Sequence, residues 1–174
     1  WSISDLSPKL LDRMLMMRYA IPHTILSWVV DHEPERAAVA FAMGMQLCLM
    51  VHGGENTLAD EPAFAERVGE LAELRKKTAD RTVMARFRGH DGLAIEGDDG
   101  FLAYAYESDA GPAVIVAACG VPANGKVVVS PDTFSVKDHP AKGQVFGLDG
   151  SVSPHTGTTC EFNLGENDVA VWTL

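Results

Sequence analysis

The sequence is poor in basic residues. It contains 14 Lys and Arg against 24 Asp and Glu, and its formal net charge at pH 7 is -10. Proteins that bind nucleic acids or anionic membrane surfaces concentrate positive charge on one face. The charge balance therefore argues against DNA, RNA and a charged membrane surface as partners.

The chain also lacks a long hydrophobic run. Its longest apolar stretch, about 37–51, is interrupted by Gly44 and Gln46, and a membrane-spanning helix needs about 20 apolar residues. We therefore expect no transmembrane segment and no membrane partner. The first residue is Trp1 and no leader sequence follows it. This start indicates that an upstream part was removed or never included.

Motifs for metals and cofactors are missing as well. The three cysteines, Cys48, Cys119 and Cys160, are an odd number, and none forms a CxxC pair. We interpret all three as reduced core thiols, which favours a cytoplasmic location. HExxH, P-loop and GxGxxG patterns are absent. The sequence predicts neither a metal ion nor a cofactor.

The first half of the chain predicts alternating helices and strands. Capping residues and helical spacing of apolar residues indicate helices at about 8–18, 33–45 and 61–78. Between them, 24–30 and 46–51 are apolar on both faces, which is typical of buried parallel strands. The first 80 residues therefore predict an α/β region.

The pattern changes from Arg81 onward to alternation with a period of two. Short turn sequences such as "GDDG" and "LDGS" separate the apolar runs, and regular spacing of this kind favours an antiparallel β-sandwich. The boundary near 79–82 has no flexible linker, so 1–80 and 81–174 are expected to pack on each other. The predicted strands are 82–88, 93–96, 101–107, 113–118, 126–129, 144–148, 158–164 and 168–174.

Two parallel strands are too few for a stable parallel sheet. The simplest interpretation makes 1–80 the last βα units of a (β/α)8 TIM barrel, a fold of about 250 residues. The expected fold class is thus α/β plus all-β, with 81–174 as a C-terminal β-sandwich domain. A missing N-terminal barrel segment or a partner chain would complete the barrel.

Short motifs in the same order resemble the C-terminal end of a retaining-type glycoside hydrolase of the α-galactosidase-like clan. They are "SWVVDHEP", "VHGG", "LAELRKKTADRT", "GHDGLAIEGDDGFLAYAYESDAGPAVIVAACG" and "GENDVAVWTL". In such enzymes a barrel precedes a small antiparallel β-domain. The resemblance implies a carbohydrate substrate and hydrolysis of O-glycosyl bonds. It also implies that the main catalytic carboxylates sit on middle barrel strands, outside this chain.

The loop after the first predicted strand carries one group of candidate site residues, because barrel enzymes place function at the carboxyl ends of strands. Trp28 could stack on a sugar, and Asp31 or His32 could bind its hydroxyls. Asp31 follows the strand directly and is the candidate catalytic carboxylate. In the alternative interpretation, Asp31 caps a helix and Trp28 fills the core.

The loop after the second predicted strand carries the other group. His52, Glu55 and Asn56 present polar groups beside two glycines, which let a backbone approach a ligand closely. In the alternative interpretation, these residues form an ordinary strand-to-helix turn and their side chains are solvated. We assign these three residues, with Trp28 and His32, to substrate binding.

Two functional hypotheses follow. In the first, the chain is the C-terminal portion of a carbohydrate-active glycoside hydrolase, with the β-domain bracing the barrel. In the second, it is a self-contained non-catalytic α+β module that binds carbohydrate or protein. The first predicts that strands 24–30 and 46–51 present an apolar surface that something outside the chain covers.

Overall fold

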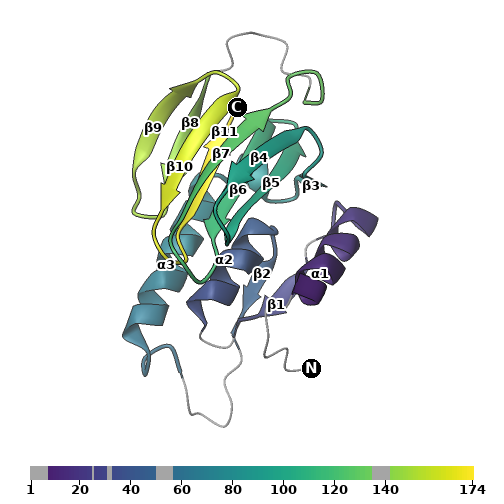
Figure 1. The fold of residues 1–174 in the computed structure, drawn as a ribbon. Helices are drawn as coiled ribbons and strands as arrows, with labels where there is room; N and C mark the ends of the chain where they lie inside the picture. The colour runs from purple at the N-terminus through teal and green to yellow at the C-terminus, as the bar shows by residue number, and fades with distance from the viewer. Residues whose placement is uncertain (1–7, 25, 31–32, 50–56, 135–141) are drawn as a thin grey trace.

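The computed structural model describes residues 8–24, 26–30, 33–49, 57–134 and 142–174 (Figure 1). Helices gather on one side of the described part and strands on the other. The helices are α1 (Pro8–Ala20), α2 (Pro34–Ala42), α3 (Pro62–Lys77) and the short α4 (Ala79–Thr82). Proline stands at the first turn of α2 and α3, where its missing N–H costs no helical hydrogen bond.

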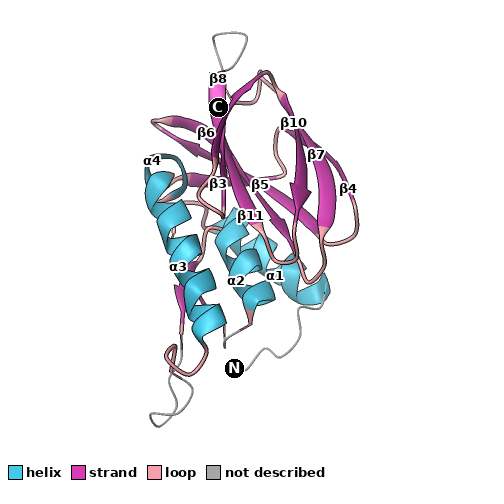
Figure 2. Ribbon diagram, turned by 90° about the vertical axis from the view of Figure 1, so that its left-hand side faces the viewer, coloured by secondary structure: helices cyan, strands magenta, loops and turns pink. Residues whose placement is uncertain are grey.

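Most strands belong to two antiparallel sheets. One has six strands in the order β3-β5-β6-β11-β8-β9, and the other has three in the order β10-β7-β4. Their bounds are β3 Arg86–Gly89, β4 Leu93–Gly97, β5 Phe101–Ser108, β6 Gly111–Ala118, β7 Ala123–Val129, β8 Lys142–Gly147, β9 Val152–Thr156, β10 Thr159–Leu164 and β11 Val169–Thr173. Figure 2 shows the layers: helices α2 and α3, the six-stranded sheet, and the three-stranded sheet.

The predicted fold class is wrong. The described chain is a small domain of mostly antiparallel sheets with four helices, and it does not consist of several TIM-barrel βα units followed by a β-sandwich. Its parallel pairing is confined, among the described residues, to β1 (Ser27–Val29) and β2 (Gln46–Cys48). These strands are short, and Gln46 and Cys48 are exposed. Because α2 packs against the six-stranded antiparallel sheet, no larger parallel sheet is needed to bury it.

The core between α2 and the six-stranded sheet is almost entirely apolar. Every residue from Arg36 to Ala42 in α2 is buried, and alanines let the helix approach the sheet closely. The facing side chains come from alternate positions of the strands, as the period of two requires. They include Tyr104, Tyr106, Ala113, Ile115, Ala117 and Val171.

The opposite face of the six-stranded sheet packs on the three-stranded sheet. Val114, Val116 and Trp172 point into this second core from β6 and β11, and Val127 and Phe162 meet them from β7 and β10. Strand β10 alternates exposed and buried residues along its whole length. The central strands of the six-stranded sheet are therefore covered on both faces, whereas the edge strand β9 is mostly exposed.

Candidate functional site

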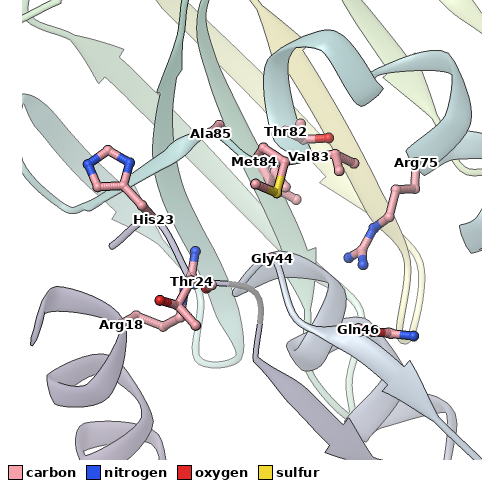
Figure 3. A pocket seen from close by; sticks show the side chains of 11 residues that line it. Arg18, His23, Thr24, Gly44, Gln46, Arg75, Thr82, Val83, Met84 and Ala85 are labelled. Carbon is pink, nitrogen blue, oxygen red and sulfur yellow. The ribbon is translucent and has the colours of Figure 1, made fainter. Parts of the chain in front are cut away.

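A cavity of about 210 Å³ lies where the helix layer meets the edge of the six-stranded sheet. Its walls come from the end of α1, the turn after α2, the last part of α3 and the segment between α4 and β3. Figure 3 shows Arg18, His23 and Thr24 on one side, and Arg75 and Gln46 on the other. The cavity lies at the amino-terminal ends of β1 and β2, the end opposite to the loops that the sequence favoured.

Arg18 is the buried basic residue of the cavity. The side chain is only 3% exposed, although arginine is almost never buried without a partner. One guanidinium N–H donates to the carbonyl of Thr24, and the group lies 4.9 Å from the centre of the Phe87 ring. The buried Nε has no hydrogen-bond partner among the described residues. Desolvation by burial lowers the pKa of Arg18 from its ordinary value.

Arg75 approaches the cavity from α3. Its Nη1 donates to the carbonyl of Met45 at 2.6 Å, its Nη2 donates to that of Phe41 at 3.4 Å, and its guanidinium stacks on the Phe41 ring at 4.5 Å. The Phe41 carbonyl belongs to the last turn of α2, where the helix dipole favours a cation, and the Met45 carbonyl lies in the turn that follows. Burial lowers the pKa of Arg75 as well.

Tyr106 lies in the core near both arginines. It is completely buried, and its hydroxyl donates to the carbonyl of Ala42 at 2.6 Å. The positive charges of Arg18 and Arg75 act to lower its pKa, but burial has the larger effect. Desolvation raises the pKa of Tyr106 far above its ordinary value, so the phenol stays neutral. It therefore cancels none of the positive charge of the arginines.

The net charge of the cavity is positive. Its described lining contains two arginines and no Asp or Glu, and no described carboxylate forms an ion pair with either one. The carboxyl end of α2 contributes only about half a negative charge, against a full positive charge on each guanidinium. A strongly acidic chain thus carries one cavity suited to an anion.

The remaining rim of the cavity is apolar. Val83 and Met84 are 38% and 69% exposed, and Figure 3 shows the Met84 side chain between the two arginines. Met84 has a φ of 62°, a left-handed conformation that is uncommon for a residue other than glycine. Strained backbone of this kind occurs often at ligand sites.

The residues that the sequence nominated lie elsewhere. Trp28 is 8% exposed and packs in the core with α2, so most of its ring surface is covered within the chain. Its role in sugar binding stays a prediction. The candidate catalytic carboxylate Asp31 and the candidates His32, His52, Glu55 and Asn56 lie outside the described residues.

Sequence reasoning missed both arginines. Arg75 continues the apolar stripe of α3, four residues after the buried Leu71. Arg18 similarly follows the buried Met14 by four residues in α1. A basic residue on the apolar face of a helix was therefore the available signal.

Neither a comparison with protein-family models nor one with curated protein sequences finds a match to this chain. Among the described residues, no helix combines the length and the apolar character that crossing a membrane requires. The same residues contain no group of three or more His, Cys, Asp or Glu side chains arranged to hold a metal ion.

The three cysteines differ in exposure, which corrects the prediction that all are core thiols. Cys160 is buried and Cys119 is partly buried, but Cys48 is exposed. The Cys119 Sγ donates to Glu35 Oε1 at 3.3 Å. Burial, together with this carboxylate, raises the pKa of Cys119 to about 12, and burial raises that of Cys160 to about 11.

We therefore expect iodoacetamide at pH 8 to modify Cys48 first. The thiolate is the reactive form, and a raised pKa leaves very little of it at Cys119 and Cys160. Intact mass against time should show one fast addition followed by slow ones. Cys48→Ser should abolish the fast addition, whereas Cys119→Ser should retain it. Three additions at one rate in the folded protein would contradict the described burial.

Proposed function

We propose that the chain is a non-catalytic α+β binding domain that holds a small anionic ligand between Arg18 and Arg75. The observation that carries this proposal is a buried guanidinium, Arg18, and a half-buried one, Arg75, in a cavity whose described lining has no carboxylate. A buried charge is costly unless it is paired. An anion in the cavity would supply the missing charge and accept hydrogen bonds from donors that the protein leaves unused.

The donor count supports the proposal. A guanidinium has five N–H donors in a planar fork that matches a carboxylate or phosphate. Arg75 uses two donors on the carbonyls of Met45 and Phe41. Arg18 uses one donor on the carbonyl of Thr24. These contacts fix both side chains in place, which lowers the entropy that a ligand would otherwise lose in ordering them.

The glycoside hydrolase hypothesis stays a prediction. It rested on a barrel interpretation that the antiparallel sheets contradict, and its candidate carboxylate Asp31 lies outside the described residues. Its carbohydrate substrate and its partner chain likewise remain untested. Release of a chromophore from aryl glycosides by the purified chain is the assay that would favour it over a domain that only binds.

Isothermal titration with acetate, sulfate and the uncharged acetamide tests the anion site. We expect saturable binding of at least one anion, weaker at high salt because ions screen charge, and no binding of acetamide. Arg18→Met and Arg75→Met should each weaken binding about tenfold to a hundredfold, the range for one lost hydrogen bond to a charged group.

Arg13→Met is the matched control, because Arg13 is an exposed arginine on the same helix as Arg18. Its affinity for anions should equal that of the unmodified protein. Arg18→Lys keeps the charge and loses the planar fork, so it distinguishes charge from geometry if Arg18→Met folds poorly. Circular dichroism verifies folding of each variant. Absence of saturable anion binding by the folded protein would overturn the proposal.

A further inference from the structure

The cavity has three kinds of surface, and an inorganic anion cannot use the apolar one. The cationic part comes from Arg18 and Arg75. An uncharged polar part comes from His23, Thr24 and Gln46, and an apolar part from residues that include Val83 and Met84. A ligand that contacts all three parts must carry a charge, hydrogen-bonding groups and a carbon surface.

The polar part lies on the accessible rim. His23, Thr24 and Gln46 are all exposed, and their side chains both donate and accept hydrogen bonds. The other hydroxyl of the cavity belongs to Thr82, which is buried and donates to the carbonyl of Thr78 at 2.9 Å. The rim groups are thus the ones free to meet hydroxyls of a ligand that enters from solvent.

The apolar part lies beside the charges. Met84 is held by its left-handed backbone at a position where its side chain lies between the two arginines (Figure 3). Covering exposed carbon surface on Val83 and Met84 would stabilise a complex by roughly 25 cal/mol for each Å² removed from water. Sulfate and phosphate have no carbon surface, so neither gains this stabilisation from Val83 and Met84.

The size of the cavity limits the ligand. Its volume of about 210 Å³ is below the roughly 300–1,000 Å³ of pockets that enclose drug-sized molecules. A ligand of about six carbons is compatible with this volume, and a longer chain would extend into solvent.

Resting on the anion site proposed above, we infer that the ligand is a small hydroxylated carboxylic acid, on the scale of a six-carbon acid. Its carboxylate lies between Arg18 and Arg75, because a planar carboxylate matches the guanidinium fork. Its hydroxyls face Thr24, Gln46 and His23. Its C–H surface lies against Met84 and Val83.

Titration with D-glucuronate, D-glucose, acetate and inorganic phosphate at one ionic strength tests the inference. We expect glucuronate to bind at least about tenfold more tightly than acetate or phosphate, and glucose not to bind. Gln46→Ala and Met84→Ala should weaken glucuronate binding several-fold, and more than they weaken acetate binding. Met16→Ala is the matched control, because Met16 is an equally exposed methionine, 68% accessible, outside the cavity.

The outcomes separate the two proposals. Equal affinity for glucuronate and acetate, or tightest binding of phosphate, would leave the anion site standing and overturn the ligand class. Equal loss of glucuronate and acetate binding in Met84→Ala would also overturn the ligand class. Met84 would then affect only the binding of the carboxylate, and would make no contact with the carbon surface of glucuronate. Binding of none of the anions would overturn both.

Discussion

Trp172→Ala is expected to lower the free energy of unfolding by about 3–5 kcal/mol. Trp172 is fully buried between the two antiparallel sheets, and alanine would leave a cavity that side chains on β6 and β10 cannot fill. Urea denaturation followed by circular dichroism measures the change. The slope of the transition should stay constant, because the surface exposed on unfolding hardly changes.

Trp172→Phe is the informative companion variant. The indole N–H of Trp172 has no hydrogen-bond partner among the described residues, and an unsatisfied buried donor costs about 1–3 kcal/mol. Phenylalanine removes this donor and keeps most of the apolar ring. We therefore expect Trp172→Phe to cost less than half as much as Trp172→Ala. A loss below about 1 kcal/mol in Trp172→Ala would contradict its position in the core between the sheets.

Gly44→Ala is expected to cost roughly 2–5 kcal/mol, through backbone strain and overpacking together. Gly44 has a φ of +66°, and a Cβ placed there would lie 2.9 Å from the Tyr106 ring. Tyr106 cannot move away easily, because it is completely buried and its hydroxyl donates to Ala42. The same urea experiment measures the loss.

Gly69→Ala is the matched control for a glycine substitution. Gly69 is exposed in the interior of α3, and no atom lies within 4 Å of the position its Cβ would take. Alanine there should stabilise the protein by about 0.5–1 kcal/mol, the difference in helix propensity. The prediction for Gly44 fails if the two alanine variants have the same stability.

Local structure was predictable from the sequence. The period of two identified strands such as β5, β6 and β10, and Pro34 and Pro62 marked the first turns of α2 and α3. Strand β9 was missed because it is mostly exposed and contains Pro154, so it has neither alternation nor a continuous apolar run. The short helix α4 was also missed, because residues 79–82 were predicted to be the boundary between the α/β region and the β-domain.

The arrangement of these elements was not predictable in the same way. Strands 24–30 and 46–51 were expected to be longer and buried on both faces, and this expectation led to the barrel. Their apolar residues are instead divided between two short strands and the core under α2. Apolar runs of this length do not distinguish a strand of a large parallel sheet from a short strand that leads into a turn.

The candidate site depends on contacts that no local pattern encodes. Arg18, Arg75 and Tyr106 come from α1, α3 and β5, and they meet only because α2 ends beside them. The spacing of apolar residues predicted the buried faces of α1 and α3. It gave no information on which strand those faces would meet, and therefore none on the shared tyrosine.

The hydrogen bond from Tyr106 to Ala42 also bears on cooperativity. It joins β5, in the antiparallel part of the chain, to the carboxyl end of α2, and the side chains around it form one continuous core. Separating the helix layer from the sheet would expose this tyrosine to water and move it away from the two arginines. Helix α2 and the six-stranded sheet therefore share one core, and we expect them to unfold together.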